Sequence, residues 1–332
     1  MPAVTISVLN FKGGVGKTTL SVNIAAALAN TYSFSKERNF RVLLIDADAQ
    51  SNASVFMLGE FWRKEVFPNP EKSLYGIMER LKNGNIKTID KHDIFGQFDE
   101  SDPKSPVFSI EKKIDQEGAS QYVDSDTYWS NLHIIPSHYN LNNFEKDLKY
   151  DENGKINIPA FAAPIYYFEM LDRISSFIRE YYDFIIIDCP PSLYTMTEIS
   201  LYFSKNIIIP VIPDWLSTNG INWLIMQVKM LSGKFGGDSK NIRAIIPTLW
   251  NIREHVFSRH IRILTKSLGF WKKNENYKDI LKKCEIYGGL QRLASINKAI
   301  ESLRPIIDYQ SSEPARVQLE LMAEKIANWG DE

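Results

Sequence analysis

The chain has 332 residues, with 39 lysines and arginines against 40 acidic residues and 44% hydrophobic residues. This average composition excludes a disordered chain, a collagen-like repeat and a disulfide-stapled miniprotein. The start of the chain does not resemble a signal peptide, and no apolar run approaches the roughly 20 residues that a membrane helix needs. We therefore expect a cytoplasmic protein.

Six short apolar runs predict β-strands. They occupy residues 4–9, 41–46, 132–136, 183–188, 206–211 and 242–246. They are rich in β-branched residues and too short for helices, as is typical of strands buried on both faces of a parallel sheet. Helical spacing after Gly16 and over residues 165–180 alternates with them. We expect an α/β fold, a doubly wound and mostly parallel sheet flanked by helices.

Residues 60–130 interrupt this alternation. They contain four prolines and scattered charge, and they show little periodicity after Ile94. We interpret them as an insertion within a single domain that spans residues 1–332, and we expect 95–128 to be its least ordered portion.

A glycine-rich loop at residues 12–19 directly follows the first predicted strand and precedes a predicted helix. Its glycines let several backbone N–H groups point into one concavity, which attracts phosphate together with the helix N-terminus. Lys17 would neutralise the β- and γ-phosphates, and the Thr18 hydroxyl would be a Mg²⁺ ligand. The expected nucleotide-binding residues of this loop are Gly13, Gly14, Val15, Gly16, Lys17, Thr18 and Thr19.

The loop departs from the ordinary P-loop pattern at its start. Phe11 stands where that pattern has glycine, and Lys12 adds a second lysine. The loop resembles the deviant Walker A motif of the ParA/MinD ATPase family. This resemblance implies a P-loop NTPase fold that binds ATP, and a homodimer in which Lys12 reaches the partner subunit's nucleotide. It makes Lys12 and Lys17 catalytic candidates.

Two acidic residues, Asp46 and Asp48, end the strand at residues 41–46. Carboxylates in such a position can hold Mg²⁺ through water or orient an attacking water. Residues 46–52 resemble switch I of the same family. The resemblance implies that Asp48 aligns the hydrolytic water and that Asp46 belongs to the Mg²⁺ environment, and it places the insertion after switch I.

Residues 184–192 resemble the Walker B strand and switch II of the family, which implies that Asp188 is a metal ligand. The neighbouring Cys189 has no second cysteine close in the sequence, so we expect a buried thiol rather than an iron–sulfur ligand. The loop 247–251 occupies the position at which family members contact the base, which makes Asn251 a candidate nucleotide-binding residue.

Members of this family differ in what their ATP dimers bind. ParA-like members bind nonspecific DNA, whereas MinD-like members bind membranes through a C-terminal amphipathic helix. Residues 321–332 end in acidic residues and lack the basic polar face of an interfacial anchor. We therefore expect no membrane partner.

The near-zero total charge hides an uneven distribution. Residues 231–310 contain 15 lysines and arginines and 7 acidic residues, a net +8 that leaves −9 on the rest. Within them, residues 254–268 form an amphipathic helical pattern with a basic face that suits the phosphate backbone of DNA. A merely solvated helix face is the alternative. The candidate DNA contacts are Arg259, Arg262 and Lys266.

Taken together, the resemblance implies a slow Mg²⁺-dependent ATPase of the ParA partition type that converts ATP and water to ADP and phosphate. Such a protein would dimerise on ATP, bind nonspecific double-stranded DNA on the nucleoid and segregate plasmid or chromosome cargo. A ParB-like protein would stimulate hydrolysis. The alternatives are an ATPase that positions a protein cargo, a MinD-like membrane-cycling regulator, and a metabolic enzyme that uses ATP on the same fold.

Overall fold

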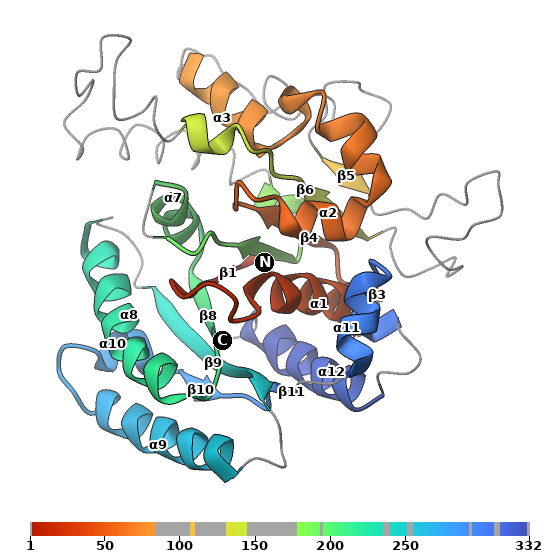
Figure 1. The fold of residues 1–332 in the computed structure, drawn as a ribbon. Coiled ribbons are helices and arrows are strands. Elements are labelled where there is room, and N and C mark those ends of the chain that lie inside the picture. Colours follow the sequence, from red (N-terminus) through yellow and green to blue (C-terminus); the bar gives the residue numbers. More distant parts are fainter. Residues whose placement is uncertain are drawn as a thin grey trace.

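The computed structural model of the chain describes residues 2–83, 107–109, 131–144, 178–192, 195–234, 240–250, 255–291, 294–308 and 313–330. One mostly parallel sheet forms the centre of the fold (Figure 1). Its strands are β1 (Val4–Val8), β4 (Val42–Asp46), β5 (Phe108–Ser109), β6 (Leu132–Ile135), β7 (Phe184–Asp188), β8 (Asn206–Val211), β9 (Asn241–Trp250), β10 (Glu285–Ile286) and β11 (Leu290–Gln291).

The strands lie in the order β10-β9-β8-β1-β7-β4-β6-β5, and β11 also pairs with β9. Among the described strands of this sheet, only β5 runs antiparallel to its neighbour. All six strands predicted from apolar runs are present, and the predicted doubly wound α/β fold is confirmed.

The central strands are buried on both faces because their side chains are apolar at successive positions. In β7, Ile185 and Ile187 lie in one core cluster, whereas Phe184 and Ile186 lie in the other. Successive side chains of a strand point to opposite faces, so one continuous apolar run contributes to two layers of core.

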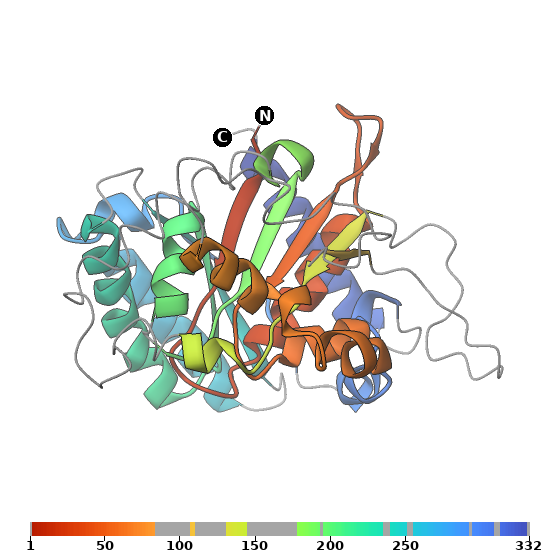
Figure 2. The same cartoon turned by 90° about the horizontal axis from the view of Figure 1, so that it is seen from above.

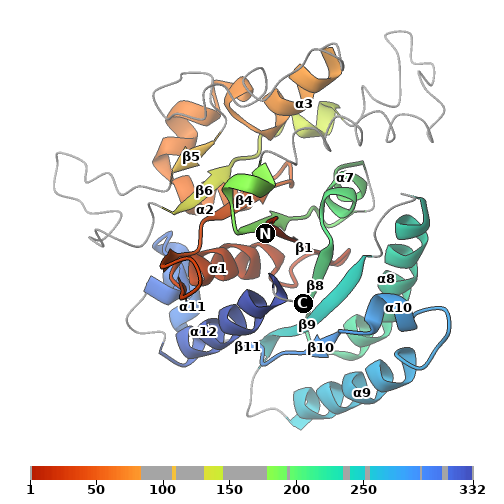
Figure 3. The same ribbon diagram turned by 180° about the vertical axis from the view of Figure 1, so that it is seen from behind.

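Helices cover both faces of the sheet (Figure 2). On one face lie α1 (Lys17–Ala29), α2 (Asn52–Leu58), α11 (Ala294–Glu301) and α12 (Glu313–Ala327). On the other face lie α3 (Leu74–Asn83), α7 (Thr195–Phe203), α8 (Trp215–Lys234), α9 (His255–Trp271) and α10 (Lys278–Leu281). Shorter helical turns occupy Trp62–Val66, Pro70–Lys72, Ile306–Asp308 and Asn328–Gly330. Helix α9 lies beyond the β9–β10 side of the sheet (Figure 3).

The C-terminal helix α12 packs along α1. Its Leu319, Met322 and Ile326 are buried in the same core cluster as Leu20 and Ile24 of α1. The apolar side of this helix is therefore covered by the rest of the fold. Within the described residues, no helix is both long enough and apolar enough to cross a membrane.

Of the proposed insertion 60–130, the structure describes residues 60–83 and 107–109. The first part contains a π-helical turn followed by α3, and its Val66, Met78 and Leu81 are fully buried. This part therefore contributes to the core. The rest of 95–128, and most of the helix predicted over 165–180, lie outside the described residues.

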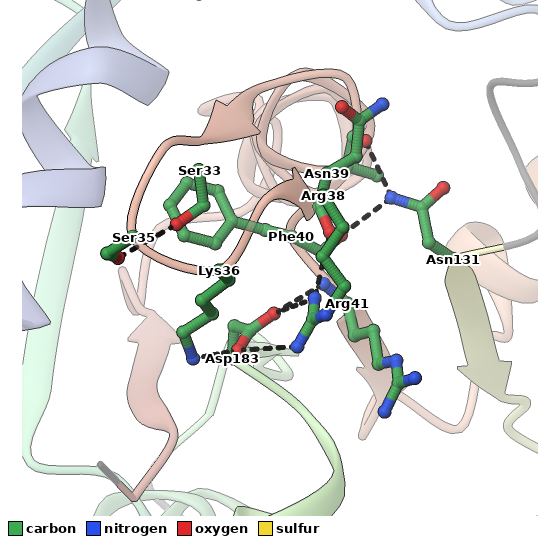
Figure 4. A network of polar contacts seen from close by, with 10 residues as sticks. Ser33, Ser35, Lys36, Arg38, Asn39, Phe40, Arg41, Asn131 and Asp183 are labelled. Atoms are coloured by element: carbon green, nitrogen blue, oxygen red, sulfur yellow. Dashed lines mark hydrogen bonds and ion pairs between the residues drawn. The ribbon is translucent and has the colours of Figure 1, made fainter.

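A small antiparallel hairpin, β2 (Tyr32–Ser33) with β3 (Arg38–Asn39), is tied to the amino end of β7 (Figure 4). The carboxylate of Asp183 accepts hydrogen bonds from Lys36, from Arg38 Nη1 at 2.7 Å and from the backbone N–H of Arg41 at 2.7 Å. Burial alone would raise the pKa of Asp183, but these bonds hold it below its ordinary value. They bind the hairpin at the edge opposite the carboxyl ends of the strands.

Candidate nucleotide-binding site

The three motifs found in the sequence meet at the carboxyl edge of the sheet. Strand β7 lies between β1 and β4, all three run parallel, and Asp46 and Asp188 are direct register partners. The loops that follow these strands therefore leave the sheet side by side.

The glycine-rich loop has the backbone geometry of a phosphate cradle. Gly14 and Gly16 have φ angles of 72° and 80°, in the left-handed region that side chains disfavour. Gly13 and Gly14 are exposed, and a Cβ atom on either would meet nothing within 4 Å, so open space lies beside this part of the loop. Helix α1 starts at Lys17, and its first N–H groups follow the loop directly. This arrangement suits an anionic phosphate group.

Two polar side chains that the sequence analysis missed anchor this loop. Asn10 donates from Nδ2 to the carbonyl of Pro210 at 2.7 Å and accepts the backbone N–H of Lys12 at 3.0 Å. Thr248 donates from Oγ1 to the carbonyl of Val15 at 2.7 Å. Both anchors are buried, so the loop is fixed to β8 and β9 as well as to its own strand.

Lys17 is held beneath the loop, with Nζ donating to the carbonyl of Lys12 at 3.3 Å. Burial lowers the pKa of Lys17, while the carboxylates of Asp188 and Asp48 oppose this shift. The lysine, both carboxylates and the open loop thus form one electrostatically connected site.

Asp188 is fully buried and has one occupied and one unoccupied oxygen. Ser21 donates from Oγ to Oδ1 at 2.8 Å, whereas Oδ2 has no hydrogen-bond partner among the described residues. Burial, helped by nearby Asp48, raises the pKa of Asp188 to about 6, although the nearby hydroxyls of Thr18 and Ser21 oppose this shift. Because buried oxygens are almost always satisfied, an orphan carboxylate oxygen beside a phosphate loop fits a metal ligand.

The donor set also fits the way that proteins bind Mg²⁺. No group of three His, Cys, Asp or Glu side chains within the described residues could hold a metal by itself. Mg²⁺ usually takes only one or two protein ligands and completes its shell with water and substrate phosphates. Thr18 and Asp188 would supply such a partial shell.

Asp46 uses its oxygens to hold the following turn. It accepts the backbone N–H of Ser54 at 2.8 Å and its Oγ at 2.6 Å, and it accepts the N–H of Asp48 at 3.1 Å. Burial and the nearby Asp188 raise its pKa to about 8. These bonds place Asp46 behind the turn, and its role in the Mg²⁺ environment stays a prediction.

Asp48 lies on that turn and is half-buried. Its Oδ1 accepts the N–H of Gln50 at 3.0 Å, and Ser51 then adopts a left-handed φ of 57° before α2 begins. The half-buried carboxylate is thus held through one oxygen, and the other can receive a water. Its position beside Lys17 and Asp188 is compatible with the predicted role in orienting water.

The remaining candidates lie elsewhere. Asn251 lies outside the described residues. The basic helix is confirmed as amphipathic, because Leu264 and Leu268 of α9 are buried. The three candidate DNA contacts, Arg259, Arg262 and Lys266, are exposed on its other face. The thiol of Cys189 is buried, as predicted, and burial raises its pKa to about 12.

Replacing Asp188 with asparagine is expected to stabilise the nucleotide-free protein at pH 8 and to abolish the expected Mg²⁺-dependent hydrolysis of ATP. The folded-state pKa is raised, so ionising this carboxylate costs free energy that grows as pH rises from about 4 to 6 and then stays constant. The amide avoids that cost, which is on the order of 1–3 kcal/mol. Thermal unfolding at pH 8 and pH 4 measures the effect.

The gain should be full at pH 8 and mostly lost at pH 4, where the folded carboxyl is protonated and about half of the unfolded carboxyls are. A variant that is less stable at pH 8 than the wild type would contradict the charge-based explanation. Ser21→Ala provides a control, because it removes a donor to the same carboxylate and should destabilise the protein.

Comparison with known proteins finds relatives along the whole chain. A family model described as an AAA domain matches residues 3–238. The sporulation initiation inhibitor protein Soj of Bacillus subtilis is 26% identical over 324 residues, which cover 97% of this chain and 98% of Soj. An uncharacterized protein of Methanocaldococcus jannaschii is 27% identical over 321 residues, 97% of either chain. The structure of a Cyanothece McdA–ATP complex has a TM-score of 0.62 at 17% identity, covers 98% of this chain and 96% of that chain, and shows a shared fold.

Proposed function

The chain belongs to the AAA domain family and is a ParA-like P-loop ATPase, and on this premise we propose that it is an ATP-dependent partition or positioning ATPase. In this proposal it dimerises on ATP, binds nonspecific double-stranded DNA and moves plasmid or chromosome cargo. The observation that carries the proposal is the meeting of the two-lysine loop, Asp48 and Asp188 at one sheet edge.

The open loop and the start of α1 would receive the phosphates of ATP. Lys17 would neutralise the β- and γ-phosphates, and the backbone N–H groups of residues 13–19 would surround them. Thr18 and Asp188 would hold Mg²⁺, with Asp46 behind them. When bound, the ion would offset negative charge on the phosphates during hydrolysis. Asn251 would contact the base.

Asp48 would orient the water that attacks the γ-phosphate, which converts ATP and water to ADP and phosphate. The rate gain would come from positioning and from charge at the γ-phosphate, because direct transfer to water needs no covalent intermediate. Lys12 would complete the site of a second subunit. Turnover would be slow until a ParB-like partner stimulates it, because a switch needs a long-lived ATP state.

The exposed basic face of α9 supports binding to the DNA backbone. Arg259, Arg262 and Lys266 lie on one side of a helix whose other side is fixed by buried Leu264 and Leu268. Contacts of this type give affinity without sequence readout, and they would place the dimer on the nucleoid. The membrane alternative gains no support, because the apolar side of α12 is buried against α1.

The test is DNA binding with ADP, ATP and a non-hydrolysable ATP analogue at several salt concentrations. We expect binding with ATP and the analogue and little with ADP. Replacing Arg259 and Arg262 together by alanine should weaken binding about tenfold and reduce the slope of log affinity against log salt by about 2. Fluorescence anisotropy of a labelled duplex measures both quantities.

A matched control removes the same charge elsewhere. Arg63 and Lys64 are well exposed and pair with Glu60 near α2, on the other side of the sheet. Their double alanine variant should bind DNA as the wild type does. An equal loss of DNA affinity in both variants would mean that only the net charge matters. An unchanged affinity in the α9 variant would exclude this surface. Nucleotide-independent binding would contradict the proposed function itself.

A further inference from the structure

The ε-ammonium of Lys12 is bound by its own chain. Its Nζ lies 3.2 Å from Oδ2 of Asp214 and donates to Oγ of Ser217 at 2.8 Å. Both partners lie at the start of α8, about two hundred residues away in the chain. We call Lys12, Asp214 and Ser217 the latch.

The same segment also holds the backbone of Lys12. Asn10 accepts the N–H of Lys12 and donates to the carbonyl of Pro210 at the end of β8. Both the main chain and the side chain of Lys12 are therefore attached to the segment that runs from β8 into α8. Lys17 is held differently, because its ammonium lies under the loop and near the carboxylates of Asp188 and Asp48.

Asp214 has a second, structural task at the same place. Its Oδ1 accepts the N–H of Ser217 at 2.6 Å, which caps the first turn of α8, and its Oδ2 accepts the Ser217 hydroxyl at 2.9 Å. Although partial burial would raise its pKa, the bonds from Ser217 and Lys12 lower it, so the carboxylate stays charged. One side chain thus caps the helix and neutralises Lys12, and the two tasks can be separated by substitution.

We propose that Asp214 and Ser217 are positioning residues that hold Lys12 on its own subunit and thereby raise the ATP concentration needed for dimerisation. The proposal rests on the proposed function, in which Lys12 contacts the nucleotide of a second subunit. The phosphates of that nucleotide and the carboxylate of Asp214 compete for one ammonium group. A subunit whose Lys12 is bound to Asp214 and Ser217 (latch closed) therefore dimerises less readily than one whose Lys12 has left them (latch open).

The size of the effect follows from the exposure of the ion pair. The side chains of Lys12 and Asp214 are 44% and 38% exposed, so solvent screens their attraction. Exposed pairs of this kind shift an equilibrium by about two- to fivefold. Two latches open in each dimer, so removing them should tighten dimerisation about four- to 25-fold.

The first experiment compares dimerisation of the wild type and Asp214→Asn with a non-hydrolysable ATP analogue, by sedimentation velocity. Asparagine caps helices as well as aspartate does, so the start of α8 is kept while the charge that holds Lys12 is lost. We expect the dimer dissociation constant to fall about four- to 25-fold. Asp279→Asn is the matched control, because Asp279 of α10 forms an exposed ion pair with Lys229 of α8 at 3.8 Å, away from Lys12. It should dimerise as the wild type does.

An unchanged dissociation constant in Asp214→Asn would overturn the proposal, and so would a weaker dimer, which would mean that Asp214 receives the lysine of the second subunit. If the wild type forms no dimer with the analogue, the proposed function fails at this point. The latch is then still tested by a second measurement that needs no dimer.

That measurement is acetylation of lysine amines in the nucleotide-free protein, followed by mass spectrometry of the peptides. Asp214→Asn should raise the labelling rate of Lys12 about two- to fivefold and leave Lys229 unchanged. Asp279→Asn should not change Lys12. Ser217→Ala removes the hydroxyl that accepts from Lys12 and donates to Asp214, but it keeps the charge of Asp214, so it should raise Lys12 labelling by a smaller factor. Equal Lys12 rates in the wild type and Asp214→Asn would show that no latch exists in solution.

Discussion

Replacing Asp48 with alanine is expected to lower ATP turnover by about 100-fold or more while ATP binding is kept. The reason is geometric. Asp48 follows β4, the neighbour of the strand β7 that ends at Asp188. One of its carboxylate oxygens accepts the N–H of Gln50, and the other is left to bind water. Under the proposed function, in which hydrolysis releases the dimer from DNA, the variant should accumulate as an ATP dimer on DNA. Phosphate release and DNA retention after ATP addition measure the two effects.

Asp48→Asn separates the chemistry from the structure of the turn. Its amide oxygen can still accept the N–H of Gln50, so the turn before α2 is kept while the charge is lost. Turnover should fall in both variants if Asp48 orients water. A wild-type rate in the asparagine variant would assign the effect of alanine to the turn, and a wild-type rate in both would refute the assignment.

Replacing Lys12 with alanine is expected to abolish ATP-dependent dimerisation and leave monomeric ATP binding largely intact. Lys12 is exposed and its ammonium is held by the first turn of α8 on its own chain, so its loss leaves the loop backbone attached through Asn10. Light scattering with ATP measures the dimer, and fluorescence of a labelled nucleotide measures binding. An unchanged dimer would contradict the role of Lys12 across the interface.

Lys17→Ala is the contrasting control. This lysine is buried under the loop, and its charge is matched by Asp188 and Asp48. Its loss should remove nucleotide binding itself, and dimerisation would fail only as a consequence. The two lysine variants thus differ in binding although both should be monomeric, which distinguishes a residue of the local pocket from one that acts on a partner.

Much of the fold could be read from local patterns. Continuous apolar runs such as residues 184–188 indicated strands buried on both faces, and the structure places their alternate side chains in two cores. The amphipathic pattern of α9 predicted which side is buried. These predictions succeeded because the burial of an element determines its own apolar pattern: a continuous run in a strand buried on both faces, and helical spacing in a helix buried on one side. Residues 60–72 were harder, since short helical turns separated by prolines leave no long period. Helix α3 does have a helical spacing of buried residues, at Leu74, Ile77, Met78 and Leu81, which the interpretation of 60–130 as an irregular insertion left out.

The sequence by itself determined the chemistry that this protein carries: a glycine loop with two lysines, a pair of aspartates after one strand and a third after another. Only the tertiary structure decided what surrounds these groups. Ser21 reaches Asp188, Thr248 reaches the phosphate loop, and Asp214 reaches Lys12 from the end of the neighbouring strand β8. Such contacts depend on strand order and register, which join residues far apart in the chain and leave no spacing to detect. The loop is specified locally, but its anchors and the resting position of Lys12 are specified by the fold.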